Sequence, residues 1–504
     1  MPLIATRGAA SAQGFGEFAQ SAAPVYIEDV FSTYLYTGNS STQTITNGID
    51  LSGKGGMVWL KDRTTAYSNI VTDTVRGAGQ VLVTNATDAS TSALYGAQSF
   101  SSTGFGLSSA IQTNNSGDNL VSWTFRKQAK FFDIVTYTGN GSGSRQISHN
   151  LQSIPGFIIV KRTDTTSPWW CCPRYSNGTY GYGSPSPQFF GLNGTQAIGT
   201  SGIDAVGAGY ISATTFNPSI VDGYGQTNIS GGTYVAYLFA HNAGGFGLTG
   251  TDNVISCSSF TTDASGNATV TLGYEPQWVL FKASSAVDDW SILDNMRGFV
   301  AGGTNADKIL YPNKADAEIG SYNMGLTATG FTGASNLAAS TTYIYIAIRR
   351  GPMKTPTSGT SVFSPVAFNS SASAQTITPG IVTDLTLTNY RNTTNGFEWF
   401  DRLRGITGTT ASGNPMLTST STAAETNSTD VNGSGQTTLT IGGGVAGYTQ
   451  IAECFSRAPS FMDVVCYTGD SSGTKAIAHN LGVVPELYIV KVRNTSGSVS
   501  YTHL

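Results

Sequence analysis

Short apolar runs separated by turn-forming residues recur along the whole chain. Residues 157–160 (Phe-Ile-Ile-Val) and 278–281 (Trp-Val-Leu-Phe) are continuous apolar stretches, which are typical of strands covered on both faces. Residues 343–348 combine β-branched and aromatic side chains, which favour extended backbone. Clusters of Gly, Asn, Ser and Asp, such as 140–144 and 470–473, favour tight turns. Amphipathic periodicity longer than about 12 residues does not occur, so the pattern predicts an all-β protein.

The apolar runs belong to a repeat about one small domain long. Residues 137–161 and 467–491 match without a gap, from Tyr-Thr-Gly through His-Asn-Leu to Ile-Val-Lys. The strand that ends in lysine, here called the lysine strand, has weaker copies ending at Lys61 and Lys282. An aromatic-rich closing strand follows the copies that end at Lys61, Lys161 and Lys282, at residues 120–125, 234–239 and 343–348, and another at residues 448–455 follows a degenerate copy at 384–391. A spacing of roughly 105–115 residues with many short strands indicates one β-sandwich or jelly roll per repeat.

The repeat predicts tandem β-sandwich (jelly-roll or lectin-like) domains in a beaded array behind an extended N-terminal arm. The last repeat stops after its lysine strand, which predicts a raw apolar sheet edge and a natural chain that continues beyond Leu504 or is completed by a partner. The predicted segments are an attachment arm at 1–29, unit 1 at 30–129, unit 2 at 130–245 (the most divergent), unit 3 at 246–352, unit 4 at 353–459 (degenerate) and an incomplete unit 5 at 460–504.

Composition narrows the function classes. Lys and Arg number 26 against 30 Asp and Glu, so the chain lacks the basic surface of a nucleic-acid-binding protein. No run of about 18 apolar residues predicts membrane insertion, and the N-terminus does not have the pattern of a secretory signal. The 61 glycines follow no three-residue period, which excludes collagen. Five scattered cysteines predict free thiols rather than a disulfide framework or a zinc site.

A second repeated motif is Asp-x-x-Arg-Gly, which follows an apolar strand. The structural interpretation is a turn held by an Asp–Arg pair, with Gly in the left-handed conformation. The alternative interpretation is a ligand site on each sandwich, but repetition in several units favours the structural role. The motif residues are Asp73 and Arg76, Asp294 and Arg297, and Asp401 and Arg404.

Candidate ligand chemistry is concentrated in unit 2, which replaces the motif with a Trp-Trp-Cys-Cys sequence. Trp169, Trp170, Tyr180 and Tyr182 could stack on sugar rings. The alternative interpretation is that they fill a core or a subunit interface.

Catalytic and cofactor signals are weak. Residues 245–250 fit Gly-x-Gly-x-x-Gly but precede a strand pattern, so an inter-domain hinge is favoured over a nucleotide site. His149 and His479 occupy one repeat position and are expected to cap a turn. The neighbouring acids Glu398 and Asp401 resemble surface carboxylates more than a glycosidase pair, as do Asp288 and Asp289. The sequence therefore predicts a non-enzymatic protein without metal or cofactor.

The repeat sequence, YTGNG, SHNL, PGFIIVKR, DxxRG and YVAYLFA in order, resembles tandem repeats of tail fibre and related virion proteins of bacteriophages, notably those of marine bacteria and cyanobacteria. The opening TRGAASAQGFG also resembles the N-terminus of such proteins. The resemblance implies lectin-like β-sandwiches and a structural or host-recognition role on the virion. Unit 4 departs from the pattern, because it lacks YTGN and has Arg391 where other units are expected to have lysine.

From this resemblance we expect a tail fibre or adhesin that assembles as a homotrimer. Its N-terminal arm would bind other virion proteins, and its units would contact a host surface glycan or protein with added avidity. The open alternatives are a capsid-decorating or baseplate structural protein, a polysaccharide-degrading tail spike, and a bacterial surface adhesin.

Overall fold

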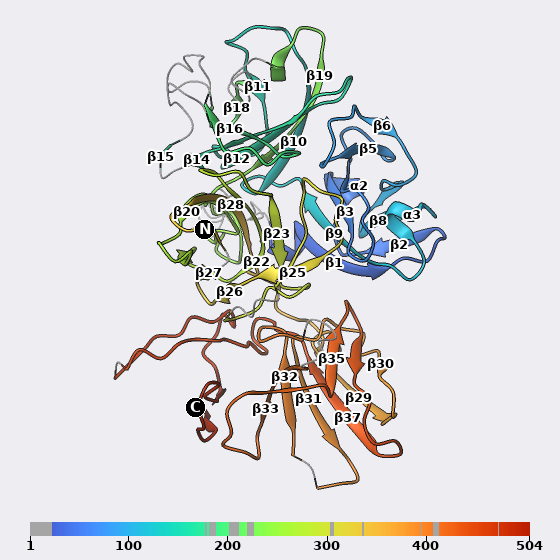
Figure 1. The fold of residues 1–504 in the computed structure, drawn as a ribbon, viewed down its shortest axis with the longest axis vertical. Helices are drawn as coiled ribbons and strands as arrows, with labels where there is room; N and C mark the ends of the chain where they lie inside the picture. The colour runs from blue at the N-terminus through green and yellow to red at the C-terminus, as the bar shows by residue number, and fades with distance from the viewer. Residues whose placement is uncertain are drawn as a thin grey trace, which may run out of the picture.

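The computed structural model describes residues 23–176, 179–180, 188–200, 211–218, 226–302, 307–334, 337–394, 396–406, 413–471 and 473–503. Antiparallel sheets dominate this part of the chain, which confirms the predicted tandem β-sandwich fold. Units 1, 2 and 3 lie side by side, and unit 4 forms a second lobe beneath them (Figure 1). Within the described residues, no helix has the length and apolar character needed to cross a membrane.

Unit 1 shows the common architecture of a large sheet packed on a small one. Its large sheet has the order β1 (Phe31–Thr37), β9 (Asn119–Arg126), β3 (Gly56–Asp62), β4 (Ile70–Asp73), β5 (Gln80–Val83) and β6 (Thr91–Ser92). Its small sheet has the order β2 (Gln43–Thr46), β8 (Gly104–Leu107) and β7 (Ser99–Ser101). Three short helical turns complete it: η1 (Ile27–Asp29), α2 (Leu51–Lys54) and α3 (Ile111–Asn114). The closing strand β9 therefore lies between the first strand β1 and the lysine strand β3, antiparallel to both.

Units 2 and 3 repeat this central placement of the closing strand. The large sheet of unit 2 has the order β10 (Phe132–Thr138), β19 (Thr233–Phe239), β12 (Phe157–Arg162), β13 (Trp169–Pro173), β16 (Gln188–Gly191) and β17 (Gly199–Thr200). Its other elements are β11 (Ile147–Ser148), β14 (Tyr175–Ser176), β15 (Thr179–Tyr180), β18 (Thr215–Phe216) and η3 (Gln226–Asn228). The large sheet of unit 3 has the order β20 (Ile255–Thr261), β28 (Thr342–Arg349), β22 (Pro276–Ala283) and β23 (Ser291–Asp294). Its other strands are β21 (Ala268–Thr271), β24 (Asp307–Ile309), β25 (Ile319–Tyr322), β26 (Met324–Thr327) and β27 (Gly330–Gly333).

Unit 4 is a complete sandwich, whereas the described part of unit 5 contains a single hairpin. The large sheet of unit 4 has the order β29 (Phe363–Asn369), β37 (Thr449–Phe455), β31 (Leu385–Tyr390), β32 (Glu398–Asp401), β33 (Asn414–Thr418) and β34 (Thr426–Ser428). Its other elements are β30 (Gln375–Ile377), β36 (Leu439–Ile441), β35 (Val431–Ser434) and η4 (Gly359–Ser361). Unit 5 contributes β38 (Leu487–Val490), paired with β39 (Ser500–His503).

The large sheets of units 1–3 bury both of their faces. One face covers the core of its own sandwich, as Val58 does in unit 1. The other face enters one continuous apolar core that the three units share, where Phe125 of unit 1 meets Phe239 of unit 2 and Trp278 of unit 3, each with ring centroids 5.7 Å apart. Burial on two sides explains why the lysine strands are apolar at consecutive positions.

Backbone hydrogen bonds join the three units into a closed ring. Each unit has a loop after its outer strands, here called the acceptor loop, at residues 83–90, 191–198, 311–318 and 418–425 of units 1 to 4. The end of the lysine strand of unit 2 binds the loop of unit 1 through Ser90 N–H to Thr163 C=O, 2.9 Å. The bond from Ile198 to Ser284 joins unit 3 to unit 2, and the bond from Glu318 to Arg63 joins unit 1 to unit 3.

The same bond attaches unit 5 to unit 4, because Glu425 N–H donates to Arg493 C=O at 2.8 Å. The N-terminal segment helps to fasten the ring, since Ile27 N–H donates to Pro352 C=O at 3.0 Å. Of the predicted attachment arm, residues 1–22 lie outside the described residues.

Strand register corrects one detail of the sequence alignment. Leu385 of β31 pairs with Asp401, as Met57 of β3 pairs with Asp73. Counting four residues onward places Asn389, and not Arg391, at the position of Lys61. The expectation for Arg391 was therefore wrong, because unit 4 has lost the apolar run by which the lysine strands were aligned.

Replacing Phe125 by alanine tests whether the shared core holds the three units together. The ring is fully buried, so Phe125→Ala should destabilise units 1–3 by about 3–5 kcal/mol. Phe455 is the matched control, because it pairs with Phe363 as Phe125 pairs with Phe31 but is only half-buried. Phe455→Ala should cost about 1–2 kcal/mol. Chemical unfolding followed by tryptophan fluorescence measures both, and equal losses would contradict the shared core.

Candidate functional site

The Asp-x-x-Arg-Gly motif forms a turn at the end of its strand. Asp294 Oδ2 accepts Arg297 Nε at 2.7 Å, and Asp294 Oδ1 accepts the Arg297 backbone N–H at 3.0 Å. Arg297 also donates to the carbonyl of Ile292, and Gly298 has a φ of 122°, which disfavours any side chain there. Asp73 and Arg76 form the same ion pair, as do Asp401 and Arg404. The geometry matches the structural interpretation of the motif.

The motif also carries contacts between units, which sequence reasoning missed. Trp123 of unit 1 donates its indole N–H to Asp294 Oδ2 of unit 3 at 3.0 Å, and Tyr237 of unit 2 donates to Asp73 Oδ2 of unit 1 at 2.8 Å. On the outer side, Glu318 binds both Arg297 and Arg63 of unit 1. Burial alone would raise the pKa of Glu318, but the two guanidinium groups hold it below its ordinary value. The motif therefore fixes the ring as well as its own turn.

Two of the three buried lysines of the lysine strands, Lys61 and Lys161, make a second set of inter-unit contacts, whereas Lys282 donates to the carbonyls of Ala283 and Ala286 in its own unit. Lys61 donates to the carbonyls of Tyr67 and of Ala315 in unit 3, and Lys161 reaches the carbonyl of Thr87 in unit 1. Burial lowers the pKa of Lys61, Lys161 and Lys282 to about 8. Backbone carbonyl oxygens accept hydrogen bonds from all three ammonium groups, and for Lys61 and Lys161 one of these carbonyls belongs to the acceptor loop of a neighbouring unit.

The candidate sugar-binding aromatics of unit 2 do not form one exposed platform. Trp169 is 1% exposed, stacks on Tyr237 with 6.3 Å between ring centroids and donates to the carbonyl of Val83 in unit 1 at 2.9 Å. The possible ligand role of Trp169 is therefore wrong, and the alternative interpretation holds for this residue, because its ring is buried in the shared core at the interface between units. Trp170 is half-buried and packs on Phe189. Tyr180 belongs to β15, but its side chain lies outside the described residues, as does Tyr182 entirely.

The histidines His149 and His479 cap the same turn in units 2 and 5. His149 Nδ1 accepts Leu151 N–H, and His479 Nδ1 accepts Leu481 N–H, both at 3.3 Å. The predicted capping role is confirmed. In the described part of the chain, no group of three or more His, Cys, Asp and Glu side chains is placed to hold a metal ion.

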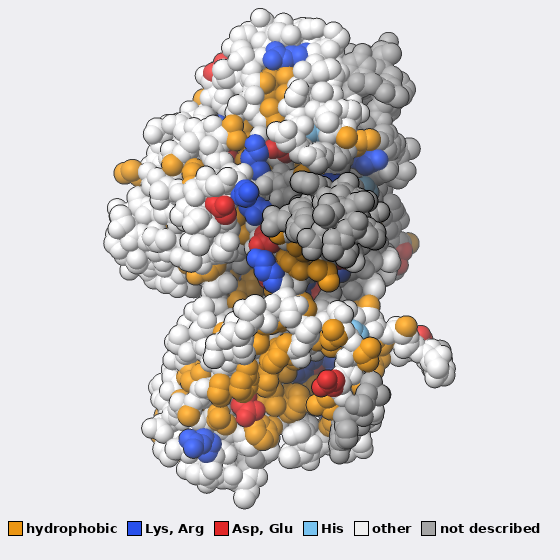
Figure 2. Space-filling view, turned by 180° about the vertical axis from the view of Figure 1, so that it is seen from behind, with side chains coloured by type: hydrophobic (Ala, Val, Ile, Leu, Met, Phe, Trp, Pro, Cys, Tyr) orange, Lys and Arg blue, Asp and Glu red, His pale blue; other side chains and the backbone are white. Residues whose placement is uncertain are grey.

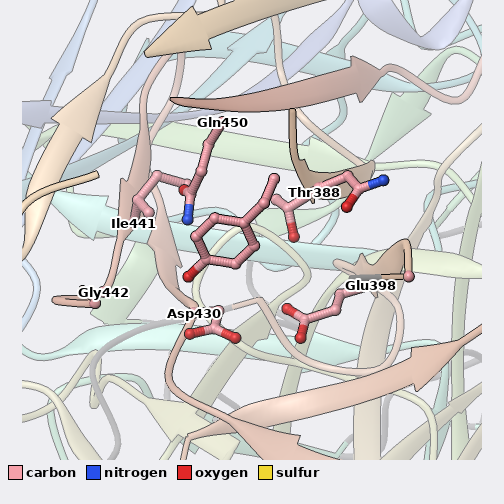
Figure 3. A pocket seen from close by; sticks show the side chains of 10 residues that line it. Thr388, Glu398, Asp430, Ile441, Gly442 and Gln450 are labelled. Atoms are coloured by element: carbon pink, nitrogen blue, oxygen red, sulfur yellow. The ribbon is translucent and has the colours of Figure 1, made fainter. Parts of the chain in front are cut away.

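A small hollow in unit 4 brings together two carboxyl groups that lie far apart in sequence. Glu398 projects from β32 toward Asp430, which precedes β35 (Figure 3). Thr388, Gly442 and Gln450 also line the hollow. Burial first, and then the hydrogen bond and charge of Asp430, raise the pKa of Glu398 to about 8. At neutral pH the pair therefore shares a proton.

The chemistry of this hollow is limited by its size. Its enclosed volume is about 20 Å³, which is room for a single water and not for a sugar ring. Of the acids singled out from sequence, Glu398 lines the hollow, and Asp401, Asp288 and Asp289 make other contacts. Asp401 pairs with Arg404, and Glu398 and Asp401, three residues apart on β32, point to opposite faces. Asp289 pairs with Lys314, and Asp288 donates its N–H to the carbonyl of Thr195 in unit 2.

A wider groove opens between unit 4 and the hairpin of unit 5. Its volume is about 630 Å³, and Trp399, Leu487 and Ile489 line it together with Ser and Thr of the unit 4 acceptor loop. Figure 2 shows hydrophobic side chains gathered over the lobe that contains unit 4. In units 1–3 the corresponding sheet face lies in the shared core. This groove is therefore bordered by apolar side chains of a sheet face that is buried in the other units.

These features define a class of protein, in which β-sandwich modules close into a ring through buried lysines, Asp–Arg turns and an aromatic core. The chain belongs to the family of the domain of unknown function DUF7483, whose family model matches residues 27–352. Those limits coincide with the ring, because the N–H of Ile27 binds the carbonyl of Pro352. No curated protein matches the chain in sequence.

Removing the carboxylate of Asp294 tests the double role of the motif. Asp294→Ala leaves Arg297 buried with a partner missing and removes the acceptor of Trp123, so we expect a loss of about 3–5 kcal/mol in the stability of units 1–3. Asp164→Ala is the control, because Asp164 pairs with Arg162 at 2.8 Å in an exposed loop and should cost about 0–1 kcal/mol. Thermal unfolding measures both. A neutral Asp294→Ala would show that the ring does not depend on the motif.

The proton shared by Glu398 and Asp430 makes the stability of unit 4 depend on pH. The folded unit binds this proton more tightly than the unfolded chain, because the pKa of Glu398 is about 8 when folded and 4.5 in its ordinary state. Stability should therefore fall as pH rises from 5 to 9. Glu398→Gln should flatten this dependence and be more stable than the native chain at pH 9. Thermal unfolding across this pH range, with Glu453→Gln as the control on the same sheet, measures the difference. An unchanged pH profile in Glu398→Gln would contradict the shared proton.

Proposed function

We propose that the protein is a non-enzymatic structural component of a bacteriophage virion, acting as a tail fibre or adhesin. Its sandwich units project from the particle, and their outer surfaces contact a host surface glycan or protein. The N-terminal residues bind other virion proteins, and the chain works as a homotrimer. These roles rest on the resemblance of the repeats to phage fibre proteins.

The proposal is supported by the contacts that the repeated polar residues make between units. Lys61 and Lys161 of the lysine strands, and Asp294 and Asp73 of two motif turns, are buried and bind neighbouring units. A side chain that is buried between modules contributes rigidity and is not available to a soluble substrate. Such repeated contacts favour a scaffold that keeps its shape outside the cell. Among the described residues, disulfides do not contribute to this rigidity, because the cysteines are free thiols.

The host-binding surface that we favour lies on unit 2. Trp170 is only half-buried there and sits beside Phe189, so part of the aromatic group predicted from sequence remains accessible. Aromatic faces next to polar loops suit sugar rings. Unit 2 also lies at the end of the molecule opposite unit 4 (Figure 1), which is where a projecting fibre would meet its receptor.

A second candidate is a capsid-decorating or baseplate protein. The groove lined by Trp399, Leu487 and Ile489 favours it, because a wide apolar surface suits another protein chain better than a glycan. In that role, units 4 and 5 would be covered by neighbouring subunits.

Immunogold labelling of intact virions tests the proposal. Antibody raised against the purified chain and selected for unit 2 should label tails, and antibody preadsorbed with the chain is the control. Label over the head would favour the decorating protein instead. Purified virions without label, although the chain is detected in infected cells, would overturn both virion assignments.

A further inference from the structure

Three polar residues of unit 4 occupy positions that are apolar in the core of unit 1. Leu60, Ile70 and Leu120 are each 0% exposed and belong to the core of the unit 1 sandwich. Strand register aligns these three residues, in this order, with Thr388, Glu398 and Gln450 of unit 4. All three polar residues line the small hollow of unit 4. Burying a polar side chain is unfavourable unless it has a partner, so a joint exchange at three neighbouring core positions indicates a compensating interaction.

The two carboxyl groups of the hollow lack a positively charged partner. Among the described residues, neither Glu398 nor Asp430 forms an ion pair, and the charged group that acts on Glu398 is Asp430. Asp401, on the same strand as Glu398, does have such a partner, because it pairs with Arg404. Two ionised carboxylates side by side repel each other. A proton shared between them reduces this repulsion, and a cation bound between them would replace it by attraction.

The hydroxyl group of Thr388 is a third oxygen in the hollow, and within the described part of the chain it has no hydrogen-bond partner. Thr388 is only 8% exposed. Figure 3 shows its side chain directed into the same space as the carboxyl groups of Glu398 and Asp430. Most buried hydroxyl groups in proteins are hydrogen-bonded, so an unpartnered one that is aimed into a hollow points to a ligand bound there.

The loop that carries Asp430 is held firmly against the hollow. The N–H of Asp430 donates to Oγ of Ser428 at 3.1 Å, and its carbonyl accepts the N–H of Gly442 at 3.0 Å. A Cβ atom on Gly442 would lie 1.9 Å from the carbonyl oxygen of Thr429, so only glycine allows this close approach. The carboxylate of Asp430 is therefore placed opposite Glu398 before any ligand binds.

We propose that the hollow of unit 4 binds one hard divalent cation of the calcium type, held by the carboxylates of Glu398 and Asp430 and by the hydroxyl oxygen of Thr388. Two carboxylates supply the charge that balances a divalent ion, and all three groups are oxygen donors, which suit a hard cation. The volume of about 20 Å³ leaves room for one ion or one water. Calcium accepts irregular sets of about six to eight oxygens that include water, whereas magnesium requires a nearly ideal octahedron.

Binding of the cation displaces the proton that the pair shares at neutral pH. The O–H bond of the protonated carboxyl group breaks, the proton leaves to water, and both carboxylates become ligands. Because the pKa of Glu398 is about 8, about one proton should be released per cation at pH 7 and almost none at pH 9.5. Tyr390 also lines the hollow and stays neutral, since burial and then the charges of Asp430 and Glu398 raise its pKa. The inference does not depend on the proposed function.

Isothermal titration of the full chain with calcium chloride tests the proposal. We expect one site with a dissociation constant of about 10⁻⁴ to 10⁻³ M, the range of calcium sites in extracellular modules. Titrations at pH 7 in two buffers with different heats of ionisation measure the released proton, and the same pair of titrations at pH 9.5 should show almost no release. Magnesium chloride should bind at least about tenfold more weakly.

Variants of the full chain locate the bound ion. Glu398→Gln and Asp430→Asn should each weaken calcium binding about tenfold or more, because each removes one charged ligand. Glu453→Gln is the matched control, since it removes a carboxylate of the same sheet outside the hollow, and it should leave binding unchanged. Thr388→Val keeps both carboxyl groups and should weaken binding about threefold or more, so it decides the question if a charge variant does not fold.

Three results would overturn the proposal. The first is the absence of binding at calcium concentrations up to about 10 mM, well above the expected dissociation constant. The second is equal affinity in the native chain, Glu398→Gln and Asp430→Asn, because the ion would then bind elsewhere. The third is calcium binding at pH 7 without release of a proton, because the ion would then not take the place of the shared proton.

Discussion

The shared aromatic core of units 1–3 is the constraint on which the rest of the structure depends. A β-sandwich needs only one apolar face per sheet, but these large sheets carry two. Exposure of the second apolar face to water is unfavourable, so each unit requires neighbours that bury it. Three units satisfy one another by closing around Phe125, Phe239 and Trp278. Polar contacts then set the geometry of the closure, because Lys61, Lys161, Asp73 and Asp294 reach their partners in neighbouring units only when the units are correctly placed.

Much of this fold is readable from the sequence, and the reason is local. The lysine strands are recognisable in the sequence as uninterrupted apolar runs, and the Gly-rich segments between them form turns. The Asp-x-x-Arg-Gly turn is also local, since both of its charged residues lie within four positions. Tandem sandwiches and the motif turn could therefore be predicted. The closure of three sandwiches into a ring could not be predicted. It depends on which apolar faces of different units match, and the sequence of one unit does not show which neighbour its face contacts.

The candidate site shows the same division between local and distant information. Glu398 and Asp430 are separated by more than thirty residues and meet through the packing of β32 against the loop before β35. Neither residue has a neighbour in sequence that signals the pair. Trp169 is the opposite case, since its aromatic surroundings in sequence allowed both a ligand site and a position in a core or interface. Only the contact with Val83 of unit 1 reveals that the ring is part of an interface.

The outer face of the large sheet of unit 4 has the residue pattern of a buried face. In β31 the threonines Thr386 and Thr388 point into the sandwich and are buried, whereas Leu385 and Leu387 face outward and are half-exposed. A sheet with one face in water has the reverse pattern. The leucines occupy the positions that Met57 and Trp59 hold in unit 1, both of which lie in the shared core. Unit 4 thus keeps the apolar outer face of a ring member, and the docked hairpin of unit 5 extends that face along Leu487 and Ile489. In units 1–3 the same face is buried against the neighbouring units of the ring.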